Sequence, residues 1–174
     1  FPPVASGEHD GLGKFTAGIG VFENLSGREL SAYACRWLPE SRELEDAAGA
    51  RDLLDALGRF CTWAQENHEV RLEEQFAPVL RSIEESLPRL VEANRRCPPV
   101  PVDAKEPWFD LVAIGPDGEA EVAVESGERR TVELAPKLDD LLRPGDVLRG
   151  KLQGRGTLQI SACFPGEARR LELA

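Results

Sequence analysis

Two histidines are the only side chains in this 174-residue chain whose ordinary pKa lies near neutrality, so a search for acid–base catalysis begins with them. His9 and His68 are each followed by an acidic residue. His68 also follows Cys61 by seven residues, which places the thiol and the imidazole on one face of an ideal helix. Such a pair would suit nucleophilic catalysis or two metal ligands. Two ligands do not make a metal site, however, and Gln65 stands where carboxylate-bridged metal bundles have Glu. We therefore expect His68 to be an exposed histidine near a helix end.

A glycine-rich stretch near the start, Gly11-Leu12-Gly13-Lys14, invites comparison with a phosphate-binding loop. Glu8 stands where the first glycine of that motif belongs, and Phe15 follows the lysine in place of Ser or Thr. The stretch is therefore read as an irregular lead-in to a strand. We predict no catalytic residue, no metal site and no cofactor for this chain.

The four cysteines lie far apart and form no Cys-x-x-Cys pair. This spacing excludes the common zinc frameworks and the dithiol redox motif. A chain of this length can build a core without disulfide bonds, so we expect the thiols to be reduced and mostly buried and the protein to be cytoplasmic. The cysteines are Cys35, Cys61, Cys97 and Cys163.

Basic side chains are concentrated on two strands expected late in the chain. Along residues 146–153, alternation puts Leu148, Gly150 and Leu152 inside and their neighbours outside. On the next strand it puts Leu158, Ile160 and Ala162 inside, with Gln159 and Ser161 outside. This hairpin would offer a set of groups able to contact phosphates, as small barrels that bind single strands do: Arg143, Arg149, Lys151, Gln153 and Arg155.

The overall charge and the aromatic residues weigh against nucleic-acid binding. The chain has 31 acidic and 21 basic residues, a net charge of −10 and a pI near 4.8, whereas binding to phosphates depends on excess Lys and Arg. Trp108, Phe109 and Phe164 fall at the ends of expected strands rather than on the basic face, where stacking platforms are needed. Nucleic acid is therefore the less favoured partner.

The first elements are expected to form a β-hairpin. Phe15, Ala17, Ile19 and Val21 alternate with small residues, residues 24–27 form a turn signal, and a second strand is expected over residues 29–37. Leu30, Ala34 and Trp37 also fit helical spacing, so a helix over residues 28–38 is the alternative.

The middle of the chain has helical periodicity. An apolar stripe predicts a helix at about residues 42–67, and a second stripe from Leu72 to Val91 keeps nearly heptad steps. Because Pro88 interrupts this second stripe, we expect two segments, 71–85 and 87–96. The stripe is too apolar for one isolated helix, so we expect a helical partner within the chain or in a second subunit.

Residues 98–107 carry four of the 13 prolines and are expected to be an extended linker. Five short strand patterns follow, at 108–114, 119–125, 129–134, 146–153 and 157–164, with a short helical turn across 137–142. Such short strands bury their apolar faces by curling into a small barrel. In architecture this resembles an SH3-like or OB-like barrel, and the resemblance covers only about residues 107–165 and implies no function.

The sequence therefore predicts an α+β protein with residues 1–97 as an α+β region containing a β-hairpin and a helical hairpin, a linker over 98–107, and a five-stranded barrel over 108–174. No run approaches the roughly 18 to 20 apolar residues that span a bilayer, so a membrane-spanning role is excluded, and the net charge of −10 argues against binding to an anionic membrane. We expect a non-enzymatic binding or adaptor protein that contacts a protein partner, or a second copy, through its helical region. Nucleic-acid binding through the basic hairpin is the alternative.

Overall fold

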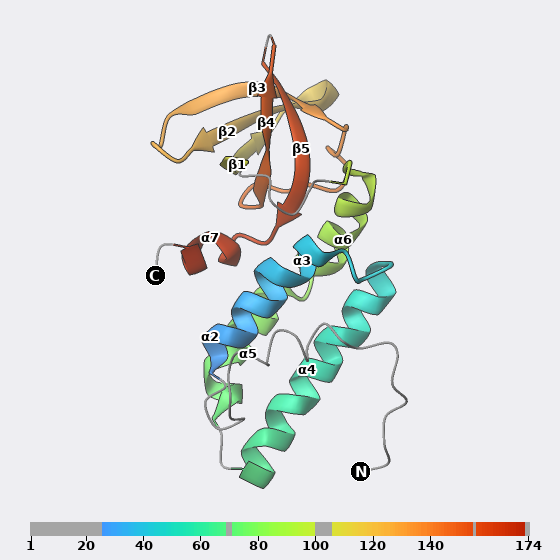
Figure 1. Ribbon diagram of the computed structural model, residues 1–174, viewed down its shortest axis with the longest axis vertical. Helices are drawn as coiled ribbons and strands as arrows, with labels where there is room; N and C mark the ends of the chain where they lie inside the picture. Colours follow the sequence, from blue (N-terminus) through green and yellow to red (C-terminus); the bar gives the residue numbers. More distant parts are fainter. Residues whose placement is uncertain (1–25, 69–70, 100–105, 155, 173–174) are drawn as a thin grey trace.

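The computed structural model describes residues 26–68, 71–99, 106–154 and 156–172. The described part is elongated, with a β-barrel at one end and a group of helices at the other (Figure 1). This confirms an α+β fold with a small barrel in the C-terminal part of the chain. None of the described helices is long and apolar enough to cross a bilayer.

The first described elements are helical, so the strand expected over residues 29–37 is wrong and the helical alternative is correct. Helix α2 (Gly27–Ala32) continues through a π-helical turn η2 (Tyr33–Trp37) into α3 (Leu38–Ser41). The cause is a capping box: Ser26 Oγ accepts from the Arg28 N–H at 3.2 Å, and Glu29 accepts from the Ser26 N–H at 2.9 Å. The other expected strand of this hairpin lies outside the described residues.

Three longer helices confirm the periodicity of the middle segment. They are α4 (Ala47–His68), α5 (Leu72–Ile83) and α6 (Ser86–Arg96). Helix α4 begins later than expected because the side chain of Asp46 caps it, accepting from the Gly49 N–H at 2.8 Å. Helix α5 contacts α4 and α2, so the apolar stripe that begins at Leu72 finds its partners within the chain.

The barrel strands are β1 (Trp108–Ile114), β2 (Glu119–Val124), β3 (Arg129–Ala135), β4 (Val147–Gln153) and β5 (Thr157–Phe164). A short 3₁₀ turn, η3 (Pro116–Gly118), joins β1 to β2. The barrel closes in the order β1-β2-β3-β5-β4, with β1 pairing with β4. All pairs are antiparallel except β3 with β5, and this order is that of the OB-like rather than the SH3-like barrel. The helical turn expected at 137–142 is a single turn, closed by the Leu142 N–H and the Leu138 carbonyl at 2.8 Å.

A β-bulge changes which side chains face the barrel interior. Arg149 pairs with Ala162 but Gly150 pairs with Ile160, so Ser161 is the extra residue. The alternation reverses past this point, and Ala162, expected inside the barrel, joins the core of the helical part.

Leu152 was also expected inside and is instead 38% exposed. The register explains this, because β1 pairs with β4 only from Val147 to Arg149 and leaves Leu152 beyond its end.

Helix α6 belongs to both hydrophobic cores. Its Leu87 and Val91 lie in the core of the helical part, whereas Leu90 and Ala93 lie in the core of the barrel. A last helix, α7 (Glu167–Glu172), was not predicted and contacts α2. The helical part and the barrel are therefore joined through shared apolar contacts as well as through the chain.

Candidate functional site

Arg149, the centre of the predicted basic hairpin, is directed onto the helical part. Its guanidinium donates to Glu40 of α3 at 2.5 Å and lies 5.7 Å from the centre of the Phe164 ring. Only 14% of the Arg149 side chain is exposed, and its Nε is buried without a hydrogen bond. Arg149 therefore connects β4 to α3 and does not face solvent as an open phosphate contact.

The other predicted phosphate contacts do not form one patch with Arg149. Lys151 is 62% exposed and lies 3.5 Å from Glu106, and Gln153 is exposed nearby at the end of β4. Arg143 precedes β4, at the opposite end of a seven-residue strand, so about 20 Å of strand separates it from Gln153. Arg155 lies outside the described residues. Nucleic-acid binding through this hairpin stays a prediction.

The outer face of β2 and β3 is the surface on which OB-like barrels commonly bind oligonucleotides or oligosaccharides. Here it is acidic, with Glu119 and Glu133 exposed, and neither strand contains an aromatic residue. Arg129 on this face is paired with Glu121 at 3.3 Å. The face therefore lacks both the excess positive charge and the stacking platforms that single-stranded nucleic acid requires.

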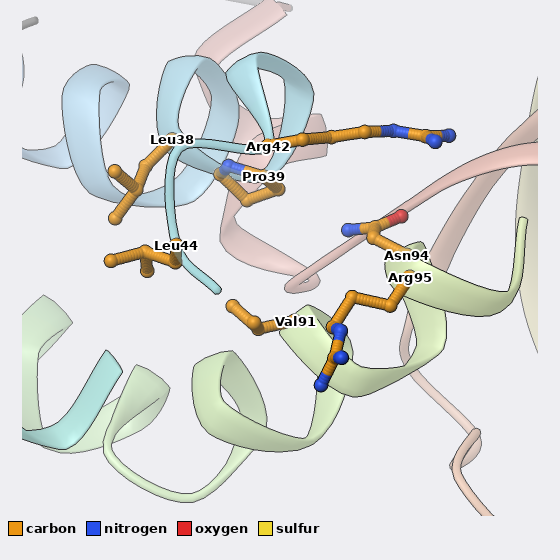
Figure 2. Close-up of a pocket in the computed structure, with 7 residues that line it drawn as sticks. All are labelled: Leu38, Pro39, Arg42, Leu44, Val91, Asn94 and Arg95. Carbon is orange, nitrogen blue, oxygen red and sulfur yellow. The ribbon is translucent and has the colours of Figure 1, made fainter. Parts of the chain in front are cut away.

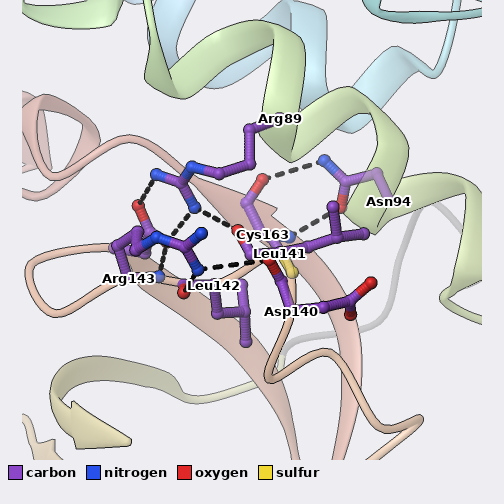
Figure 3. A network of polar contacts seen from close by, with 8 residues as sticks. Arg89, Asn94, Asp140, Leu141, Leu142, Arg143 and Cys163 are labelled. Atoms are coloured by element: carbon purple, nitrogen blue, oxygen red, sulfur yellow. Dashed lines mark hydrogen bonds and ion pairs between the residues drawn. The ribbon is translucent and has the colours of Figure 1, made fainter.

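A buried ion pair joins α6 to the loop before β4 (Figure 3). Arg89 donates to both carboxylate oxygens of Asp146, at 2.6 and 2.9 Å, and also to the Leu141 carbonyl. The Arg143 N–H donates to the same carboxylate at 2.7 Å. Because the side chain of Asp146 is only 5% exposed, these donors supply the hydrogen bonds that water would otherwise provide.

The same helix is fixed to β5 by a buried amide. The side chain of Asn94 donates to the Cys163 carbonyl at 2.9 Å and accepts from the Cys163 N–H at 2.7 Å (Figure 3). Arg42, just after α3, donates to the carbonyls of Cys97, Pro98 and Ser161 at 3.2, 2.8 and 2.9 Å. These contacts satisfy backbone groups at the bulge, so their role is to hold α3, α6 and β5 together.

A cavity lies beside these contacts, between the chain after α3 and α6 (Figure 2). Its volume is about 40 Å³, which is room for only a few water molecules. Its lining combines apolar and polar side chains: Leu38, Pro39, Arg42, Leu44, Val91, Asn94 and Arg95. The space is too small for an organic cofactor.

Aromatic and cationic side chains alternate where η2 meets the barrel. Arg36 lies 5.7 Å from the centre of the Trp108 ring, and Trp108 packs on Phe164 with ring centres 4.7 Å apart. Arg149 covers the Phe164 ring as described above. This arrangement could not be predicted from the sequence, because Arg36 and Arg149 are far apart in the chain and no local sequence pattern indicates that they come close together.

A second aromatic group lies on α4, near its C-terminal end. The rings of Phe60 and Trp63 are stacked at 6.1 Å, and Trp63 contacts His68 at 4.8 Å. Trp63 is 37% exposed. We call these three residues the α4 aromatic surface, and exposed Arg59 and Glu66 are the charged residues that neighbour Trp63 along the helix.

Another feature of α4 is a groove of about 390 Å³ that it forms with α5. Its lining combines charged and polar side chains with apolar surface and consists of Gln65, Glu73, Glu74, Ala77, Pro78 and Arg81. Arg71 and Glu74, 4.0 Å apart and well exposed, show that charges here are partly compensated. The α4 aromatic surface carries aromatic rings, which none of the residues lining this groove does, so it is the stronger candidate for a protein contact.

The thiol and imidazole expected on one face of this helix differ sharply in environment. Cys61 is buried in the helical core, and burial, followed by the negative charge of Glu73, raises the pKa of its thiol to about 11. His68 is exposed and its ring lies against Trp63. A thiol protonated at neutral pH is a poor nucleophile and metal ligand. Among the described residues, no group of three or more His, Cys, Asp or Glu side chains could hold a metal ion.

Neither a protein-family model nor a curated protein matches this sequence.

Proposed function

We propose that the protein is a non-enzymatic binding or adaptor protein that contacts a protein partner through the α4 aromatic surface. The exposure of Trp63 carries this proposal. Among the described residues, Trp63 and Leu152 are the large apolar side chains that are exposed, at 37% and 38%. Tryptophan is strongly enriched among the residues that dominate binding energy at protein interfaces, whereas leucine is under-represented there.

The geometry around Trp63 favours such a role. Its contacts with Phe60 and His68 restrict the indole ring before any partner arrives, which lowers the entropy lost on binding. A tryptophan buries roughly 250 Å² when fully covered, so covering the exposed third would stabilise a complex by about 2 kcal/mol. That magnitude is typical of an interface hot spot.

The stripe from Leu72 to Val91 is not the best candidate for this contact. Its buried residues pack against α2 and α4 of the same chain, so it does not require a second subunit. The proposed contact therefore lies on α4, within the helical region from which a protein partner or a second copy was expected.

The test is affinity capture of the tagged full-length protein from a lysate of its own cells, with and without nuclease. We expect the wild-type protein to capture a stoichiometric protein partner whose recovery does not depend on nuclease treatment. The Leu152→Ala variant should capture this partner equally well. The Trp63→Ala variant should bind it about 30-fold more weakly, which is the equivalent of 2 kcal/mol. Circular dichroism checks that Trp63→Ala remains folded. Equal recovery of the partner by both variants would reject the α4 aromatic surface as the contact. Light scattering measures the mass of the purified protein in solution and so shows whether the partner is a second copy.

The nucleic-acid alternative needs a variant that leaves the fold intact. Reversing the charge of Arg149 would break its contact with Glu40, so the cleaner change is Lys151→Glu, at a side chain that is 62% exposed. Binding of a single-stranded oligonucleotide that weakens steeply with salt and is lost in this variant would overturn the adaptor proposal.

A cytoplasmic location is part of the same proposal. All four cysteines are free thiols and buried, an arrangement that suits a reducing compartment. Cell fractionation with an antibody against the protein tests it, and recovery from an oxidising compartment would contradict it.

A further inference from the structure

Two of the buried thiols lie side by side where α6 meets β5. Cys97 follows the last turn of α6, and Cys163 is the penultimate residue of β5. Both belong to the hydrophobic core of the barrel, and each thiol lies close enough to shift the pKa of the other. They are far apart in the sequence, so only the fold brings them together.

Several contacts fix this proximity independently of the sulfur atoms. The side chain of Asn94 binds the N–H and the carbonyl of Cys163, and the backbone carbonyl of Asn94 accepts from the Cys97 N–H at 3.2 Å. Arg42 donates to the carbonyl of Cys97 itself and to that of Ser161, two residues before Cys163 on β5. The backbones that carry the two thiols are therefore held at a fixed separation.

We propose that Cys97 and Cys163 form a redox-responsive pair that a peroxide converts into a reversible disulfide between α6 and β5. The Cys97 thiolate attacks one peroxide oxygen, the O–O bond breaks, and the departing hydroxide takes a proton to become water. Cys163 then attacks the sulfenic acid on Cys97, the S–S bond forms as the S–O bond breaks, and a second water leaves. Two thiols and one hydrogen peroxide thus give one disulfide and two waters, and a thiol reductant reverses the change.

The electrostatics assign the two roles. The hydrogen bond from Cys163, helped by the charge of Arg42 and opposed by burial, lowers the pKa of the Cys97 thiol. The same hydrogen bond, followed by burial, raises the pKa of Cys163. Cys97 is therefore the attacking thiol and Cys163 the resolving thiol.

The remaining two thiols provide an internal comparison. Burial, followed by the charge of Glu167, raises the pKa of Cys35 to about 12, and the pKa of Cys61 is raised to about 11. Cys35 is completely buried, whereas Cys97 is 4% exposed and is flanked by exposed Arg96 and Pro98. Cys61 is 3% exposed, so accessibility alone does not separate it from Cys97. The lowered pKa of the Cys97 thiol does, and we expect peroxide to react first with Cys97, although more slowly than with a fully exposed thiol.

In the test, the reduced full-length protein is treated with hydrogen peroxide, and catalase then removes the peroxide. The remaining thiols are alkylated under denaturing conditions, and the peptides are mapped by mass spectrometry. We expect a disulfide that joins Cys97 to Cys163, loss of two hydrogen atoms from the intact mass, and alkylated Cys35 and Cys61. Dithiothreitol should restore all four thiols.

The wild-type protein alone decides the question, so it does not depend on the folding of any variant. A disulfide between chains, irreversible oxidation of Cys97 without a disulfide, or equal oxidation of Cys35 would overturn the proposal. Two variants add detail. Cys163→Ser should leave a sulfenic acid on Cys97 that dimedone traps, and the matched control Cys61→Ser should form the disulfide as the wild type does.

Discussion

The ion pair between Arg89 and Asp146 gives the strongest stability prediction, because it joins α6 to the barrel and is withdrawn from water. The Arg89→Met variant keeps much of the apolar stem but removes the guanidinium, which donates to both oxygens of the Asp146 carboxylate. The side chain of Asp146 is 5% exposed, and the Arg143 N–H would remain as its donor. Breaking a buried pair in this way costs about 3 to 5 kcal/mol.

The assay is urea unfolding of the wild type, Arg89→Met, Asp146→Leu and the double variant. Because each single variant leaves one charged partner unpaired, the double variant should be more stable than the sum of the two losses predicts, by at least about 1.5 kcal/mol. For a chain of this size, the loss in Arg89→Met corresponds to a fall of roughly 10 °C in the thermal midpoint.

A matched control is the pair of Arg96 and Asp140, which lies between the same two parts of the molecule at 3.0 Å but is 49% and 59% exposed. Arg96→Ala should cost less than about 1 kcal/mol, because solvent screens an exposed pair. If Arg89→Met cost no more than Arg96→Ala, or if the double variant showed no coupling, the role assigned to the buried pair would be refuted.

Three further changes test separate parts of the structure. Gly150→Ala should destabilise the protein by about 2 kcal/mol or more, because the added Cβ would lie 2.2 Å from the Gln159 carbonyl oxygen at the bulge; urea unfolding that matched the wild type would contradict this. Gly58→Ala in α4 should instead stabilise it by about 0.5 to 1 kcal/mol in the same assay, because the added Cβ meets only the Leu80 side chain at 3.5 Å. Burial raises the pKa of Cys35 from its ordinary 9.0 to about 12, so the native state holds this proton more tightly than the unfolded state and stability falls as pH rises between these values. Cys35→Ala should flatten that fall in unfolding experiments above pH 9, and an unchanged slope would argue against it.

Periodicity predicted most of the elements because burial has a simple geometric signature. In α4, Leu54, Leu57 and Cys61 recur at helical spacing and are all buried. The five strands were found within a residue or so of their bounds because tight turns separate short alternating runs. The need to cover the apolar faces of these strands predicted a small barrel, whereas its closure through the pairing of β1 with β4 came from the structure.

The errors arose where one specific interaction decided between two acceptable patterns. Residues 29–37 fit both a strand and a helix, and the cap formed by Ser26 and Glu29 favours the helix. Ala162 has the correct alternation for the barrel interior, but the extra residue Ser161 reverses the faces after it.

The candidate sites were harder to predict because they depend on distant contacts. Arg149 looked like an outward-facing base in its strand, and only the fold brings it to Glu40, 109 positions away. Cys97 and Cys163 carry no motif that announces their proximity. The sequence contained Trp63, but its exposure depends on which side of α4 the other helices cover.

Site-specific photocrosslinking on α4 tests the central claim most directly. Arg59 is exposed and lies one turn before Trp63, so a photoreactive phenylalanine analogue at position 59 would touch a partner seated on the α4 aromatic surface. The same analogue at position 152 serves as the control on the barrel. After irradiation in the protein's own cells, we expect a defined protein adduct from position 59 that Trp63→Ala abolishes, and none from position 152. No adduct from position 59, together with a protein or nucleic-acid adduct from position 152, would contradict the account.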